Sequence, residues 1–156
     1  MGRNILLITT DQMRFDALGC NGGLVAKTPN IDALAAEGIT FTQGYAANGT
    51  CAPSRAALMS GRYGTRFGFE FTPTPTGMMP IVELLGNAVE RPLPPPTESN
   101  TEQARLSYAE MGMPPSEITL AEVLKEAGYE TVLFGKWHLG AKVGHGPLDQ
   151  GFDQHF

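Results

Sequence analysis

Apolar residues fall into short blocks along the chain, and the spacing within the blocks alternates between strand-like and helix-like. Residues 4–10 form a continuous apolar run, typical of a strand buried on both faces of a parallel sheet. Residues 39–46 alternate with a period of two, and residues 129–134 are a further short strand-like run. The pattern therefore favours an α/β fold with a mostly parallel sheet flanked by helices.

Three segments carry helical spacing together with start and stop signals. Residues 28–38 begin at a capping threonine and end at Gly38, with an apolar stripe of Ile31, Leu34 and Ala35. Residues 53–60 begin with a proline, which is well placed in a first helical turn, and end before Gly61. Residues 120–127 follow a capping-box pattern formed by Thr119 and Glu122. We expect a helix at each position.

A proline-rich excursion occupies about residues 72–117. Nine of the twelve prolines lie there and the apolar periodicity fades, so we expect no core segment in it, except for a short helix around residues 102–111. It reads either as a disordered loop or as a wall of a substrate pocket. Apart from this excursion, we interpret residues 1–156 as belonging to one domain.

Two oxygen-bearing side chains, Asp11 and Gln12, follow the first expected strand. In open α/β sheets, ligands sit beyond the carboxyl ends of the strands, so a functional acid is expected here. A carboxylate and an amide oxygen suit a hard divalent cation. Asp11 as a simple turn or helix cap explains the local sequence equally well.

Cys51 lies at or just before the expected helix start. Free N–H groups and the positive end of the helix dipole stabilise an anion at that place. Arg55 follows one turn later and can direct its guanidinium group to the same point. Taken alone, a buried cysteine beside a surface arginine would be the simpler interpretation.

The third strand runs into Gly135-Lys136-Trp137-His138. If the chain stays extended, Lys136 and His138 project to one side and Trp137 to the other, which presents a cation and an imidazole together. The alternative interpretation is that Lys136 and His138 are solvent-exposed surface residues without a role in a site. His145 and His155 have no motif around them and are expected to be structural or surface residues.

Composition narrows the function classes. The 156 residues are 42% hydrophobic and 17% charged, which is typical of a globular chain, and the net charge of −5 argues against a general nucleic-acid binder. Two cysteines, Cys20 and Cys51, are too few for a disulfide framework. No signal peptide or membrane-spanning run is evident, so we expect a cytoplasmic protein, or a periplasmic or secreted one if a leader was removed.

These motifs together resemble the type I, formylglycine-dependent sulfatases of the alkaline-phosphatase-like superfamily. Residues 51–55 (CAPSR) with 58–61 (LMSG) resemble the first family signature, although Ser60 replaces the more usual threonine. Residues 128–138 resemble the second signature, and the apolar start followed by residues 11–12 resembles the family's opening. Many members carry Asp-Asp where this chain has Asp11-Gln12. The resemblance covers nearly the whole chain apart from the excursion.

The resemblance implies a mechanism. A formylglycine-generating enzyme would oxidise Cys51 to formylglycine, whose hydrated aldehyde is the nucleophile. Asp11, Gln12 and the modified Cys51 would bind a divalent metal, Ca2+ first, with Mn2+ or Mg2+ possible. Arg55 would favour the ionised diol, Lys136 would hold the sulfate oxygens, and His138 would orient or deprotonate the second hydroxyl. The substrate would be a small-molecule or saccharide sulfate ester, with no nucleic-acid or membrane partner.

Two alternatives stay open. The family's remaining metal ligands and catalytic residues lie later than this chain extends, so it reads as the N-terminal part of a sulfatase, poorly active by itself. The Asp11-Gln12 pair is also compatible with a phosphonate monoester or phosphodiester hydrolase of the same superfamily. A truncated, non-catalytic module is the remaining possibility.

Overall fold

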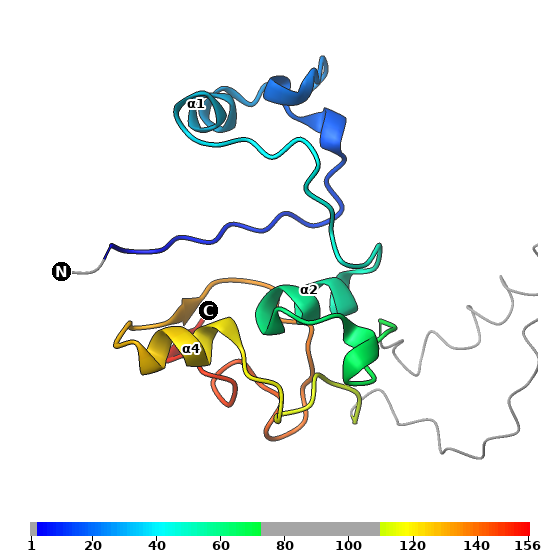
Figure 1. The fold of residues 1–156 in the computed structure, drawn as a ribbon, viewed down its shortest axis with the longest axis vertical. Helices are drawn as coiled ribbons and strands as arrows, with labels where there is room; N and C mark the ends of the chain where they lie inside the picture. The colour runs from blue at the N-terminus through cyan, green and yellow to red at the C-terminus, as the bar shows by residue number, and fades with distance from the viewer. Residues whose placement is uncertain (1–2, 73–109) are drawn as a thin grey trace, which may run out of the picture. The chain divides into compact units, whose positions relative to one another are not determined.

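The computed structural model describes residues 3–72 and 110–156, and the chain divides into two compact units, Met1–Ala46 and Ala47–Phe156. Each unit is described by itself (Figure 1). Within the described residues, no helix has the length and apolar content needed to cross a membrane. The described helices and strands are η1 (Phe15–Ala17), η2 (Gly19–Asn21), α1 (Pro29–Glu37), α2 (Cys51–Ser60), η3 (Gly64–Arg66), α4 (Leu120–Glu126), β1 (Val132–Leu133) and β2 (Gln154–His155).

The first unit is built around α1 and the short turn η2. Asp32, in α1, accepts hydrogen bonds from the backbone N–H of Cys20 at 2.8 Å and from the hydroxyl of Thr28 at 2.9 Å. The Cys20 N–H is the main reason that the pKa of Asp32 lies below its usual value. The predicted helix is therefore confirmed. Its N-cap, Thr28, makes no side-chain capping bond, because its hydroxyl oxygen accepts from the Gly19 N–H at 2.8 Å instead.

The strands predicted at residues 4–10 and 39–46 are not formed. Both segments lie outside any paired strand, and the side chains of residues 5–8 are exposed, with Leu6 at 84%. A buried strand takes its hydrogen bonds and its apolar cover from other segments. Among the described residues, only β1 and β2 pair, so neither segment has a neighbouring strand.

Among the described residues of the second unit, a buried apolar cluster is formed by α2 together with the segments around residues 69, 113 and 137–139. Its members are Ala52, Ala56, Phe69, Met113, Trp137 and Leu139. Helices α2 and α4 also contact each other beside it (Figure 1). Met113 corrects a prediction: the proline-rich stretch was expected to contribute nothing to the core, yet this side chain is fully buried. The helix predicted around residues 102–111 lies almost entirely outside the described residues.

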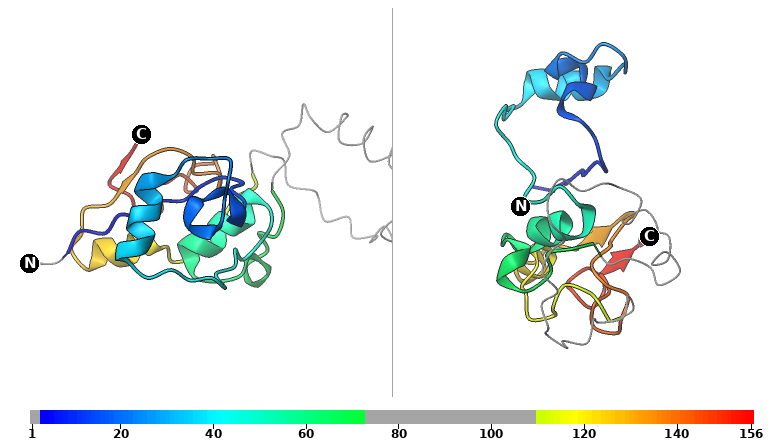
Figure 2. Two further views of the ribbon diagram at one scale, coloured as in Figure 1. Left: turned by 90° about the horizontal axis from the view of Figure 1, so that it is seen from above. Right: turned by 90° about the vertical axis from the view of Figure 1, so that its right-hand side faces the viewer.

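A two-stranded parallel sheet closes the second unit. Val132 pairs with Gln154 and Leu133 with His155, and Figure 2 shows the two short arrows side by side. The strand predicted at residues 129–134 is thus present, but only its residues 132–133 are paired. The parallel direction agrees with the prediction of a parallel sheet.

Helix α4 begins with the predicted capping box. The hydroxyl of Thr119 accepts from the N–H of Glu122 at 3.1 Å, and the Glu122 carboxylate accepts from the N–H of Thr119 at 2.7 Å. The Thr119 hydroxyl also donates to the carbonyl of Gln150 at 2.8 Å. The cap therefore fixes both the helix start and the turn that leads into β2.

Candidate active site

Cys51 is the first residue of α2, as predicted. Thr50 precedes it in an extended conformation, and the Asn48 carboxamide oxygen accepts from both the N–H and the hydroxyl of Thr50 at 2.8 Å. The first N–H groups of a helix have no intrahelical acceptor, so this turn presents donors and the positive dipole end beside Cys51. The thiol is half-buried, with its Sγ 3.8 Å from Thr72 Oγ1. A group at this position is suited to carry negative charge.

Arg55 lies one turn along the same helix face. Its Nη1 donates a hydrogen bond of 2.7 Å to the backbone carbonyl of Lys136, which is 81 residues further along the chain. This contact joins α2 to the Lys136–His138 segment. The sequence spacing predicted that Arg55 shares a face with Cys51 but gave no sign that its partner would be a backbone carbonyl.

The segment from Gly135 to Gly140 is a turn and not an extended strand. Trp137 is 8% exposed while Lys136 is exposed, so these two neighbours differ strongly in burial. His138, however, has a φ of 62°, a left-handed conformation that costs a non-glycine residue about 1–3 kcal/mol. The predicted extended geometry therefore ends at His138, which is half-buried.

Asp11 and Gln12 belong to the first unit, where both are exposed and Gln12 has a φ of 52°. Carboxylate and amide oxygens are the donors that Ca2+ and Mg2+ prefer, so the pair fits a hard cation by chemistry. Among the described residues, no three His, Cys, Asp or Glu side chains lie close enough to hold a metal ion. The meeting of Asp11 and Gln12 with Cys51 stays a prediction.

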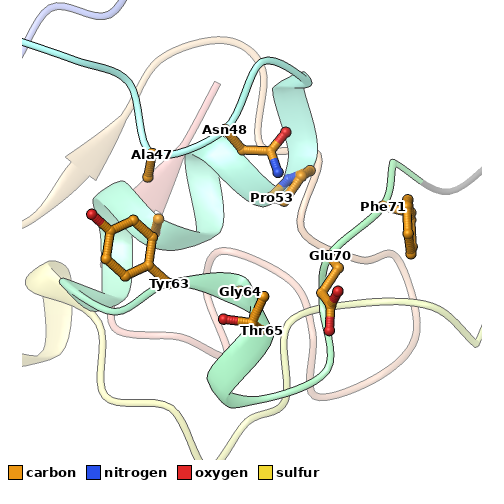
Figure 3. Close-up of a pocket in the computed structure, with 9 residues that line it drawn as sticks. Ala47, Asn48, Pro53, Tyr63, Gly64, Thr65, Glu70 and Phe71 are labelled. Carbon is orange, nitrogen blue, oxygen red and sulfur yellow. The ribbon is translucent and has the colours of Figure 1, made fainter.

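A separate cavity of about 220 Å3 lies against α2 (Figure 3). Pro53 and Ala57 contribute its helical wall, and they lie about half a turn and about a third of a turn around α2 from Cys51. Tyr63, Glu70 and Phe71 are among the other residues that line it (Figure 3). None of the predicted site residues lines this cavity, so it is not the place where Cys51 would act.

Two contacts at the site were not predicted. Thr72 approaches Cys51 from the edge of the proline-rich stretch, and nothing in its local sequence marks it. Asn48 bonds to Thr50, and an asparagine two residues before the residue that caps a helix is a recognisable signal for such a turn. The histidines without motifs have structural contacts: the His145 carbonyl accepts from Trp137, and His155 Nε2 lies 3.2 Å from the Gly135 carbonyl.

Comparison with known proteins gives the family. A sequence model described as Sulfatase matches residues 3–156. The chain belongs to the sulfatase family. The predicted resemblance is confirmed, and so is the alkaline-phosphatase-like α/β fold class, since the family model covers nearly the whole chain and a solved structure 33% identical to it superposes with a TM-score of 0.69.

Individual sulfatases match over nearly all of the chain. N-acetylgalactosamine-6-sulfatase of Mus musculus is 40% identical over 153 residues, which are 98% of this chain and 25% of that protein. Steryl-sulfatase of Mus musculus is 36% identical over 157 residues, covering 97% of this chain and 21% of that protein. The crystal structure of Ps i-CgsB superposes with a TM-score of 0.69 at 33% identity, covering 93% of this chain and 25% of that one. The chain thus spans about a quarter of the length of these relatives.

Proposed function

We propose that the protein containing this chain hydrolyses sulfate esters, with residue 51 supplying the nucleophile. The observation that carries the proposal is the 2.7 Å hydrogen bond from Arg55 Nη1 to the Lys136 carbonyl. It links the helix that begins at Cys51 to the segment that carries Lys136 and His138. Membership of the sulfatase family supports the reaction class.

Each residue has a role that follows from its chemistry. The start of α2 and the Arg55 guanidinium favour negative charge on residue 51. Lys136 is exposed and can bind the sulfate oxygens, where a fixed cation stabilises the charge that develops in the transition state. His138 can accept or donate a proton at the hydroxyl of residue 51. Formylglycine at position 51 would supply a hydrated aldehyde, which has a second oxygen for expelling sulfate.

A divalent cation would be held by Asp11 and Gln12 together with residue 51. Ca2+ suits an all-oxygen donor set best, and Mn2+ or Mg2+ would fit the same atoms. A bound cation would act as a Lewis acid towards an oxygen of the substrate. The formylglycine-generating enzyme is the partner required before the reaction.

We propose a sulfated saccharide as the substrate. The support comes from two similar proteins. One is named N-acetylgalactosamine-6-sulfatase. The other, Ps i-CgsB, has been solved in complex with k-i-k-neocarrahexaose, and that structure matches this chain with a TM-score of 0.69. An exposed lysine in a segment that is hydrogen-bonded to α2 suits the anionic group of such a molecule, while the rest of the sugar would be recognised elsewhere.

The test uses the full-length protein produced with the formylglycine-generating enzyme. Mass spectrometry of the peptide carrying Cys51 should show conversion of the thiol to the aldehyde, and an aryl sulfate should be hydrolysed faster than the matching aryl phosphonate. Cys51→Ala should abolish turnover, whereas Cys20→Ala, in the first unit, should leave it intact. An intact thiol and equal activity of the two variants would reject the proposal, and preference for the phosphonate would favour the other hydrolase class.

A further inference from the structure

The turn at residues 135–140 is held in place from outside. Gly135, His138 and Gly140 have φ values of 93°, 62° and 128°, so three of the six residues are left-handed. A turn of this kind keeps one conformation only when its surroundings impose it.

At least four hydrogen bonds, from four separate segments, impose that conformation, and His155 Nε2 also lies 3.2 Å from the Gly135 carbonyl. The Gly135 N–H donates to the Phe156 carbonyl at 2.7 Å, and the Lys136 carbonyl accepts from Arg55 at 2.7 Å. The Leu139 carbonyl accepts from the Met113 N–H at 2.8 Å. The fourth bond runs from the Trp137 indole Nε1 to the His145 carbonyl at 2.8 Å.

Among these four bonds, only the one made by Trp137 uses a side chain of the turn. In the other three, the turn contributes a backbone atom. The ring of Trp137 lies in the same buried cluster as Ala52 and Ala56 of α2 and meets Phe152 edge-on, with ring centroids 5.9 Å apart. Buried indoles combine apolar packing with a directional N–H bond, so both the depth and the rotation of this residue are fixed. Its two neighbours are Lys136 and His138, so any rotation of the chain at Trp137 moves both of them.

We propose that Trp137 is the positioning residue of the site: through its bond to the His145 carbonyl it sets the placement of Lys136 and His138 for sulfate transfer. The proposal rests on the proposed function for the roles of those two residues. The indole itself touches no reacting atom. Its effect on the reaction comes from the geometry that it imposes on its neighbours.

The test compares Trp137→Phe with Phe69→Leu in the full-length protein. Phenylalanine keeps an aromatic ring and removes the N–H donor. Phe69 is 5% exposed in the same buried cluster, so Phe69→Leu loosens the core without touching the bonds of the turn. We expect Trp137→Phe to lower kcat for an aryl sulfate by about 10- to 100-fold with KM within about threefold, and Phe69→Leu to keep kcat within about threefold.

Hydrogen–deuterium exchange gives a readout that does not depend on hydrolysis. Exchange of the backbone amides of residues 135–140 should become about tenfold faster in Trp137→Phe and stay unchanged in Phe69→Leu. If the unsubstituted protein hydrolyses no sulfate ester, the proposed function fails, and this exchange experiment still decides whether Trp137 holds the turn.

If Trp137→Phe does not fold, benzothienylalanine at position 137 replaces it, because this analogue keeps the bicyclic shape and carries sulfur in place of N–H. The same fall in kcat and the same faster exchange are expected. Unchanged kcat and unchanged exchange in either protein would overturn the proposal.

Discussion

At the scale of single residues, the guanidinium group of Arg55 has two properties that a lysine could not supply together. It carries a fixed charge near Cys51, and its planar fork reaches the Lys136 carbonyl at 2.7 Å. Arg55→Lys keeps the charge and loses the fork. We expect kcat/KM of the full-length protein on an aryl sulfate to fall by about 100-fold, since misplacement by about 1 Å costs that much.

Arg66→Lys is the matched control for Arg55→Lys. Arg66 is an exposed residue in η3, and the substitution is chemically the same. Its activity should stay within about twofold of the unsubstituted protein, as is usual for surface positions. Equal kinetics for the two variants would show that the Arg55 fork has no part in holding Lys136.

The carboxylate of Asp153 gives a prediction in pH. Lys125 Nζ lies 2.7 Å from one oxygen, and Thr131 donates to the other from its N–H at 2.9 Å. These contacts, the lysine first, lower the pKa of Asp153 to about 2 from 3.8. A lowered pKa means that the stabilisation is complete above pH 3.8 and is lost as the pH falls towards 2.

Thermal unfolding of the full-length protein between these two pH values would test that assignment. Unfolding should take up about one proton at Asp153 in this window, so the unsubstituted protein should lose stability more steeply with falling pH than Asp153→Asn does. Lys125→Gln removes the largest cause and should give an intermediate slope. Identical slopes for all three proteins would contradict the assigned pKa.

At the scale of elements, Gly151 lets the turn before β2 approach the start of α4. Its φ is 99°, and a Cβ at this position would lie 2.5 Å from the Glu122 nitrogen. Gly151→Ala should therefore lower the free energy of unfolding by about 1–3 kcal/mol, through backbone strain and through overpacking against backbone that cannot move away. Urea unfolding followed by circular dichroism measures the change.

Gly128→Ala separates the two causes. Gly128 has a similar φ of 86°, but a Cβ there would meet nothing within 4 Å. This variant should show the strain alone, about 1–2 kcal/mol. If Gly151→Ala costs no more than Gly128→Ala, then the close approach to α4 does not exist in solution.

The elements also show why sequence predicts helices better than strands here. The helix at residues 120–126 follows from Thr119 and Glu122, three residues apart, because capping and helical hydrogen bonds are local. The run at residues 4–10 has the composition of a buried strand, but its hydrogen bonds must come from other segments. The same limit applies to the site: the position of Cys51 at a helix start is local information, whereas the bond from Arg55 to Lys136 spans 81 residues.

At the scale of the whole molecule, the proposed Ca2+ site needs more oxygen ligands than Asp11, Gln12 and residue 51 can supply. Ca2+ takes about 6–8 oxygen ligands, and Asp11, Gln12 and residue 51 would supply only part of that number. The chain spans about a quarter of the length of its relatives, such as N-acetylgalactosamine-6-sulfatase, with 25% covered. We therefore expect full affinity for Ca2+ only in the full-length protein.

Asp11→Asn in the full-length protein tests whether Asp11 is one of those ligands. The substitution keeps an oxygen and removes the negative charge, so the Kd for Ca2+ measured by calorimetry should rise by about 10- to 100-fold. Asp16→Asn is the matched control, because Asp16 is an exposed acid engaged with Arg14 at 2.6 Å. A chelator should lower hydrolysis in the unsubstituted and control proteins alike. If Asp11→Asn bound Ca2+ as tightly as Asp16→Asn, the cation would have to be held without Asp11, and the residues after the first apolar run would be no more than a turn.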